Sequence, residues 1–499
     1  MKQEGSDRNQ QEVELKLALL NPHLATLPKR MAQVPALRHH QSTTQLVHNI
    51  YYDTPAQNLR QLFVALRTRR IGGKAKPQWR LTLKTGDLCD SSLSHRGEWE
   101  VPVAGAKLSR EALKSTPWKK IDPAGKIFPA LAPIFVTNFK RTSWSVLGAN
   151  GSLIEVSLDI GHIVAGPKRT PVCELELELV AGHPAALFEL AHQISNTIAL
   201  MPLSESKSAR GYALFMDTLN QPVGATPPNL SEDLSLTAAA GCVLREMFRQ
   251  FTTNLHSLRH SDDPELVHQA RVAWRRFKSA LRFFKPALDV ERVPSWDALQ
   301  PLLTELGELR DIDVARIETL PQLADVYSAE DRQRTDAWQA MMQALQQAGK
   351  LHRRAVRKAL QDPTVGSTLL TATQWLEDLA SMTGPGNQKV KPDEHLKSWA
   401  RRRIAHLHDE LKDASKNSNN SSSSAHCIRI HAKRLRYALA ALQTLLPKRR
   451  AERWCRQAAS LQMSLGAARD LAQAGVVAAR LNVDQGLAEF LRGFAIGKA

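Results

Sequence analysis

Charged and apolar side chains alternate through much of the first two hundred residues of the chain. The segment EVELK places charged residues on alternate positions, separated by valine and leucine: Glu12, Glu14 and Lys16. Alternate side chains of an extended strand share one face. The pattern therefore predicts a strand with a charged face and an apolar face.

Five further segments repeat this alternation, and together they carry both signs of charge. Their charged residues are Arg67 and Arg69; Arg80 and Lys84; Arg96, Glu98 and Glu100; Glu155 and Asp159; and Glu174, Glu176 and Glu178. One such strand alone fits a solvated sheet face. Six together favour a closed antiparallel barrel with a charged interior, and a barrel of about eight strands has room for one small ligand. We expect that ligand to be a small polyanion bound with a metal ion.

This region resembles the CYTH superfamily, the triphosphate tunnel metalloenzymes, from about residue 12 to about residue 215. The resemblance rests on ExExK at residues 12–16 and on the segments NIYYDT, LRTR, LTLK, RGEWE, FKRTSW, CELELE and SKSARGY. It implies an eight-stranded antiparallel β tunnel with flanking helices. It also implies Mg²⁺ or Mn²⁺ as cofactor and hydrolysis of inorganic triphosphate to diphosphate and phosphate.

The resemblance also implies a role for individual residues. The implied metal ligands are Glu12, Glu14, Glu174 and Glu176. The implied substrate-binding residues are Lys16, Arg67, Arg69, Lys84, Arg141, Lys207 and Arg210. The implied catalytic residues are Glu12, Glu14, Lys16, Lys84 and Glu178, while Glu98, Glu100 and Asp159 could orient the cations or the attacking water. The chemistry agrees, because Mg²⁺ binds a few carboxylates and keeps several waters.

The pattern changes after NQPVGATPPNLSED, where proline, glycine and asparagine cluster. From Ser235 onward the apolar residues follow helical spacing. We therefore predict an α+β multidomain protein, with a tunnel domain at 1–216, a linker at 217–230 and an all-α domain at 231–499. The stretch SKNSNNSSSS predicts a flexible loop within the second domain.

Two similar helical segments flank that loop and predict an internal repeat. VHQARVAWRRFKSALRFF and IRIHAKRLRYALAAL align at His268 and His431, which also aligns Arg271 with Arg434. Basic residues at steps of three or four form a stripe along a helix. A solvated face with i,i+4 pairs is the alternative for each helix, but few acidic residues stand at the neighbouring positions.

This half resembles the CHAD domain over about residues 231–495. The CHAD domain has repeated HxxR helices that are associated with binding of inorganic polyphosphate. The resemblance implies polyphosphate binding by His268, Arg271, Arg275, Arg276, Lys278, His431, Lys433, Arg434 and Arg436.

Composition adds the expectation of an anionic partner. The formal charge is +18 and the isoelectric point is about 9.8, with the excess divided evenly between 1–216 and 217–499. The pairing of the two domains resembles bacterial CYTH–CHAD inorganic triphosphatases, which favours triphosphate and polyphosphate over nucleic acid. Five cysteines without CxxC spacing fit a reducing compartment. No apolar run approaches the length of a membrane span, so we expect a cytoplasmic protein.

Two other functions stay open from the residues alone. Some CYTH relatives make cyclic AMP from ATP, and the barrel residues do not separate such an adenylate cyclase from a triphosphatase. A non-catalytic protein that binds polyphosphate in both halves would carry the same charges. Neither GxxxxGK nor GxGxxG occurs, so nucleotide binding by these loops has no support.

Overall fold

The computed structural model describes residues 11–20, 24–72, 77–86, 91–148, 150–328, 331–381, 395–416, 422–464, 467–481 and 484–498. Residues 417–421, the centre of the predicted flexible loop, lie outside these ranges. The chain divides into a barrel unit, Met1–Gln221 with Gln361–Gln374, and a helical unit, Pro222–Leu360 with Trp375–Ala499. Every helix within the described ranges is too short or too polar to cross a bilayer.

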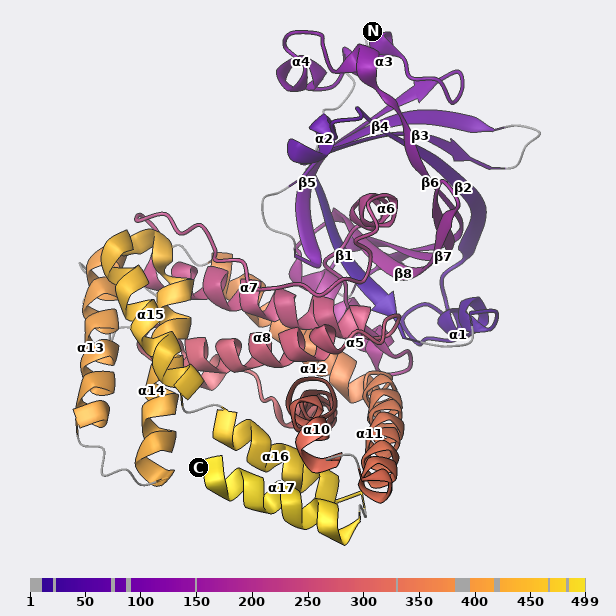
Figure 1. Ribbon diagram of the computed structural model, residues 1–499. Coiled ribbons are helices and arrows are strands. Elements are labelled where there is room, and N and C mark those ends of the chain that lie inside the picture. The colour runs from indigo at the N-terminus through magenta and orange to yellow at the C-terminus, as the bar shows by residue number, and fades with distance from the viewer. Residues whose placement is uncertain are drawn as a thin grey trace, which may run out of the picture. The chain divides into compact units, whose positions relative to one another are not determined.

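The barrel unit is built on eight antiparallel strands that close on themselves (Figure 1). They are β1 (Gln11–Leu19), β2 (Ser42–Asp53), β3 (Val64–Ile71), β4 (Gln78–Thr85), β5 (Leu93–Val103), β6 (Ala132–Leu147), β7 (Leu153–Ala165) and β8 (Lys168–Ala181). Their order is β5-β4-β3-β2-β6-β7-β8-β1, and pairing of β1 with β5 closes the ring. A short strand β9 (Leu200–Pro202) adds to β1. The predicted eight-stranded antiparallel barrel is confirmed.

Strand alternation explains which side chains face outward. The apolar residues of β1, β7 and β8 form an outer core with α1 (Leu27–Ala32), α5 (Ala185–Ser195) and Leu370 of α12 (Pro363–Ser381). The outer faces of β3 and β4 are covered by residues of α2 (Asn58–Gln61), α3 (Arg110–Leu113) and α4 (Trp118–Ile121). Burial of these apolar faces leaves the charged alternates to point into the barrel.

A short helix, α6 (Lys207–Phe215), lies inside the barrel at one end (Figure 1) and packs against β6, β7 and β8. The barrel residues at this end are apolar, and they cluster with Tyr212 and Leu214 of α6. The Tyr212 hydroxyl donates a 2.7 Å hydrogen bond to Asp53 at the end of β2. The charged part of the interior therefore ends at α6.

The helical unit consists mainly of α7 (Leu236–Ser257), α8 (Pro264–Phe283), α9 (Gln300–Asp313), α10 (Ala324–Ser328), α11 (Arg332–Ala359), α13 (Leu396–Lys416), α14 (Ser422–Ala441), α15 (Lys448–Ser464), α16 (Ala467–Ala479) and α17 (Gln485–Lys498). The two segments of the predicted repeat, which lie in α8 and α14, have similar surroundings. Helix α8 packs on α7, α14 packs on α13, and a 3₁₀ turn follows both α8 and α14. Helices α8 and α14 also contact each other.

Gly211 in α6 has no room for a side chain. An added Cβ would lie 2.2 Å from the ring of Phe135 on β6. Alanine gains about 1 kcal/mol in helix propensity over glycine, but overpacking costs about 1–3 kcal/mol. We expect Gly211→Ala to lower the stability of the chain in thermal unfolding. Gly105→Ala, where an added Cβ meets no atom within 4 Å, is the control, and a melting temperature raised by Gly211→Ala would contradict the packing.

Candidate functional site

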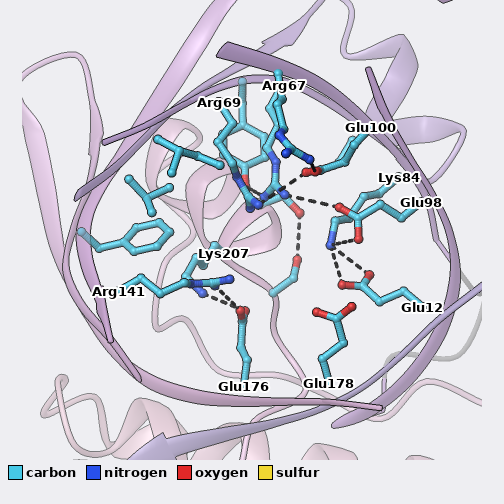
Figure 2. A pocket seen from close by; sticks show the side chains of 18 of the residues that line it. Glu12, Arg67, Arg69, Lys84, Glu98, Glu100, Arg141, Glu176, Glu178 and Lys207 are labelled. Atoms are coloured by element: carbon cyan, nitrogen blue, oxygen red, sulfur yellow. Dashed lines mark hydrogen bonds and ion pairs between the residues drawn. The ribbon is translucent and has the colours of Figure 1, made fainter. Parts of the chain in front are cut away.

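The barrel encloses a cavity of about 380 Å³, which we call the tunnel. Figure 2 shows charged side chains that converge on it from around the ring of strands. The arginines of β3 lie opposite the carboxylates of β8, with Arg141 and Lys207 on one flank and Lys84 and Glu12 on the other. The tunnel therefore presents both signs of charge to one small space.

Glu12 on β1 is held by two cations from neighbouring strands. Lys84 Nζ lies 2.8 Å from one of its carboxylate oxygens, and Arg96 Nε lies 2.9 Å from the other. Burial alone would raise the pKa of Glu12, but the attraction of Lys84 and Arg96 outweighs it and holds the pKa below its usual range. Arg96 also reaches Glu14 at 2.5 Å, so it ties the two glutamates of β1 together.

Burial raises the pKa of Glu14, and the nearby Glu176 carboxylate adds to that effect. Glu176 on β8 pairs in register with Lys16 on β1, two residues along the strand from Glu14. Burial also lowers the pKa of Lys16, with a contribution from Arg96. The pKa values of Glu12, Glu14 and Lys16 are thus shifted in different directions by burial and by neighbouring charges, and such shifts are typical of functional sites.

A second cluster joins β6, β7, β8 and α6. Asp159, which is fully buried, lies 2.7 Å from both Arg141 and Lys207. Glu176 contacts the same two cations at 2.5 and 2.7 Å, and Glu174 pairs with Lys207 and Arg210. Burial favours the neutral form of Lys207, yet these acids raise its pKa above the usual range. The Lys207 ammonium therefore keeps its charge although it is buried.

Arg67, which is buried, and Arg69, which is half-buried, alternate on β3 and have more distant acidic partners. Arg67 lies 3.5 Å from Glu98, and Arg69 lies 3.5 Å from Glu100. Burial, then repulsion from Arg67 and Arg141, lowers the pKa of Arg69 to about 10. The Nε of Arg67 is buried and has no hydrogen-bond partner among the described residues. These guanidinium groups have donor capacity to spare for an anion.

Glu178 and Glu155 differ from the other tunnel acids. Both line the tunnel on neighbouring strands and face each other in register, and Glu178 also faces Glu14. No ion pair is recorded for either within the described part of the chain. Burial, then repulsion from Glu12, raises the pKa of Glu178 to about 7, although Lys84 opposes the shift. An added cation would relieve this repulsion.

The acidic side of the tunnel offers hard oxygen ligands and no sulfur or imidazole. Carboxylate oxygens of Asp159, Glu174 and Glu176 lie within 4.8 Å of one another. Glu12, Glu14 and Glu178 approach from β1 and β8, beside this group. An all-carboxylate donor set fits Mg²⁺ or Mn²⁺ rather than zinc or copper.

The residues predicted for the tunnel converge in one place. Those lining it are Glu12, Arg67, Arg69, Lys84, Glu98, Glu100, Arg141, Glu176, Glu178 and Lys207. Glu14, Lys16, Glu174 and Arg210 are buried directly beside them. Sequence reasoning gave no role to Arg96, although its position alternates with Glu98 and Glu100. It also passed over Asn49, Tyr51 and Phe139, whose uncharged side chains carry no charge pattern.

In the helical unit, the basic residues of α8 divide into two groups. Arg275, Lys278 and Arg282 are exposed, and no ion pair is recorded for them among the described residues. His268 and Arg271 are half-buried, and Arg271 lies over Gly307 of α9, where a Cβ would come within 2.9 Å of its guanidinium. Burial and the nearby Arg310 lower the pKa of His268.

The remaining predicted residues of this unit do not all share that surface. Arg276 is 5% exposed, because it lies on the buried face of α8. On α14, His431 is half-buried with Nδ1 3.5 Å from Glu410 of α13. Lys433, Arg434 and Arg436 are half-exposed on the same helix.

Two family models match the chain, and they divide it as its contacts do except at Gln361–Gln374, which the CHAD match includes and the contacts place in the barrel unit. The family model described as CYTH domain matches residues 10–212, and the one described as CHAD domain matches residues 242–479. The chain contains a CYTH domain and a CHAD domain. The tunnel lies in the CYTH domain, and helices α8 and α14 lie in the CHAD domain.

The similar proteins match different lengths of the chain. An inorganic triphosphatase of Haemophilus influenzae is 33% identical over 205 residues, covering 41% of this chain and 55% of that protein. An uncharacterized protein of Mycobacterium tuberculosis is 26% identical over 322 residues, covering 61% of this chain and 58% of the other. The chain thus spans little more than half the length of these relatives. A crystal structure of the CHAD domain from the plant Ricinus communis matches with 27% identity and a TM-score of 0.47, covering 56% of this chain and 91% of that one.

The stability of an Asp159→Asn variant tests whether the buried charges of the tunnel stabilise one another. Asp159→Asn leaves Arg141 and Lys207 buried with one negative charge fewer, and breaking a buried pair costs about 3–5 kcal/mol. We expect the stability measured by urea unfolding to fall by about 3 kcal/mol. Glu111→Gln is the control, because the Glu111–Lys114 pair is exposed and exposed pairs contribute little. Equal stabilities of the two variants would contradict the coupling.

Proposed function

We propose that the CYTH domain hydrolyses inorganic triphosphate with a divalent metal ion, and that the CHAD domain binds inorganic polyphosphate. The observation that carries the first part is the balance of charge in the tunnel. Together with the buried groups beside the lining, its basic residues are Lys16, Arg67, Arg69, Arg80, Lys84, Arg96, Arg141, Lys207 and Arg210. Its acidic residues are Glu12, Glu14, Glu98, Glu100, Glu155, Asp159, Glu174, Glu176 and Glu178. The two sets are equal in number.

Such a balance suits a polyanion that binds together with cations. A tunnel lined by basic residues alone would take a bare anion, and a tunnel lined by acids alone would take metal ions. Here the basic residues of β3, β4, β6 and α6 can hold phosphate oxygens, while the carboxylates of β1 and β8 can hold the metal. A bound Mg²⁺ or Mn²⁺ would polarise a phosphoryl oxygen and orient a water molecule.

Specific residues would then share the work of phosphoryl transfer. Arg67, Arg69 and Lys84 would bind one part of the triphosphate, and Arg141, Lys207 and Arg210 would bind the other. Their positive charge would stabilise the charge that spreads over the transferred group. Glu12, Glu14, Glu174 and Glu176 would ligate the metal, and Glu178 would orient the attacking water.

The closed end of the barrel supports a short substrate. The inner face turns apolar beside α6, where the residues of the barrel pack on Tyr212 and Leu214. A long polyphosphate chain would have to pass this plug to thread the barrel. A linear triphosphate needs only the charged part of the tunnel. The name of the Haemophilus influenzae relative agrees with this choice.

Phosphate release tests the proposed reaction. With Mg²⁺, we expect the chain to release phosphate from tripolyphosphate well ahead of ATP or long-chain polyphosphate, and a chelator of divalent ions to abolish the release. Glu12→Gln removes a ligand and the partner of Lys84, so kcat should fall by about a hundredfold or more. Glu111→Gln is the control. No release from tripolyphosphate would refute the proposal, and cyclic AMP formed from ATP would favour the cyclase.

Salt titration of polyphosphate binding tests the role of the CHAD domain. Arg275, Lys278 and Arg282 form an exposed stripe on α8, so changing all three to alanine should weaken binding of long-chain polyphosphate. Each lost contact should also lower the salt slope by about 1, by analogy with counterion release. The matched control changes Lys350, Arg354 and Lys358, an exposed basic stripe of α11, to alanine. Equal losses in both triple variants would mean that net charge, and not the α8 stripe, binds the polymer.

A further inference from the structure

Strand β2 supplies uncharged polar side chains to a barrel interior that is otherwise rich in charge. Asn49 and Tyr51 stand on alternate positions of this strand and are almost fully buried. They pair in register with Arg69 and Arg67 of β3. Each neutral residue therefore lies directly opposite one of the two tunnel arginines.

The Tyr51 hydroxyl accepts a hydrogen bond from Arg67. The distance between Arg67 Nη1 and the hydroxyl oxygen is 3.2 Å, and both groups are buried. The Tyr51 ring is itself held by stacking on Phe135, with ring centroids 4.6 Å apart and planes 21° from parallel. A fixed ring gives the hydroxyl a fixed position, and the hydroxyl restricts the guanidinium in turn.

Asn49 restricts Arg69 in a similar way. Its amide oxygen accepts a 2.9 Å hydrogen bond from Arg69 Nε. Its amide nitrogen donates to the hydroxyl of Thr137 on β6 at 2.7 Å, and Thr137 is fully buried. The bond to Thr137 turns the amide so that its oxygen faces the arginine. Arg69 thus has one side fixed and keeps its terminal nitrogens toward the tunnel.

Neutral acceptors can orient Arg67 and Arg69 without neutralising their charge, whereas carboxylates cannot. Arg67 and Arg69 repel each other, so without a partner each guanidinium would swing away from its neighbour. Glu98 and Glu100 lie 3.5 Å from these guanidinium groups. A carboxylate in closer contact would hold the arginine more tightly, but it would also neutralise it further and compete with phosphate. An amide and a phenol hold the geometry and leave the positive charge available.

We propose that Asn49 and Tyr51 are positioning residues, which hold the guanidinium groups of Arg69 and Arg67 in the orientation that receives the triphosphate. This inference rests on the proposed function of the tunnel. It predicts that the two residues act on phosphate affinity through the arginines, without contributing a charge of their own.

Steady-state kinetics with tripolyphosphate test the role of Tyr51. Tyr51→Phe keeps the stacked ring and removes only the hydroxyl, so KM should rise about tenfold, as for other residues that orient a ligand. The change in kcat should be smaller than the change in KM, because Arg67 keeps its charge and loses only one of the contacts that hold it in place. Asn49→Leu should raise KM in the same way. An unchanged KM for Tyr51→Phe overturns the proposal.

Tyr52→Phe provides the matched control. Tyr52 is the next residue of β2, is similarly buried, and donates a 2.8 Å hydrogen bond to the carbonyl of Ala106 outside the tunnel. Losing its hydroxyl costs stability only, so its KM should match that of the unaltered chain. A rise in KM equal to that of Tyr51→Phe would assign the effect to a weakened strand and overturn the proposal.

A double-mutant cycle separates action through Arg67 from direct contact with substrate. In an Arg67→Lys background, Tyr51→Phe should have little further effect on KM, because the bond that it removes is already lost. Fully additive effects would overturn the positioning role. If the unaltered chain hydrolyses no tripolyphosphate, the proposed function fails, and equilibrium binding of tripolyphosphate tests the positioning role by itself. Tyr51→Phe should then weaken that binding about tenfold and Tyr52→Phe should not.

Discussion

Mutual neutralisation of buried charges is the constraint on which the barrel depends. An ion taken out of water is costly unless it is paired and hydrogen-bonded. The strands of this barrel turn their leucines outward, so most of their inward-facing charged residues are removed from bulk solvent and pair with one another. Arg96 between Glu12 and Glu14 and Asp159 between Arg141 and Lys207 are the two points where this is done most fully. In the proposed reaction a polyanion would compete for the cations of these pairs, and its metal ion would compete for the carboxylates.

Helix α6 illustrates how strongly the interior field acts. Lys207 and Arg210 stand in the first turn of this helix, where the backbone dipole disfavours positive charge. They are stable there because Asp159, Glu174 and Glu176 surround them. The acids of β7 and β8 and the cations of α6 therefore hold the plug in place as one network, and the apolar contacts of Tyr212 and Leu214 complete the closure.

The alternation of side chains along a strand explains how much of this arrangement could be predicted from the sequence. Charges at alternate positions fix which side chains share a face, and one closed barrel then brings all of those faces together, so the tunnel set followed from spacing and resemblance. The alternation does not show which residues of different strands contact each other. Arg96 was placed on the charged face but was given no role, because its partners lie on β1, which becomes its neighbour only when β1 and β5 close the ring. Asn49 and Tyr51 carry no charge, and their relevance appears only in the register with β3.

In the helical unit, the sequence did not predict which of the basic residues are exposed. Arg275 and Arg276 are adjacent in sequence, yet successive residues of a helix point about 100° apart, so one is exposed and the other is buried. The exposed cations of α8 have no recorded acid partners within the described chain, whereas the cations of the tunnel contact acidic side chains of the barrel. Exposed charges are screened by salt over about 10 Å, and buried pairs much less. The proposed binding of polyphosphate at the α8 stripe should therefore depend steeply on salt, while the proposed binding of triphosphate in the tunnel should depend chiefly on a divalent metal ion.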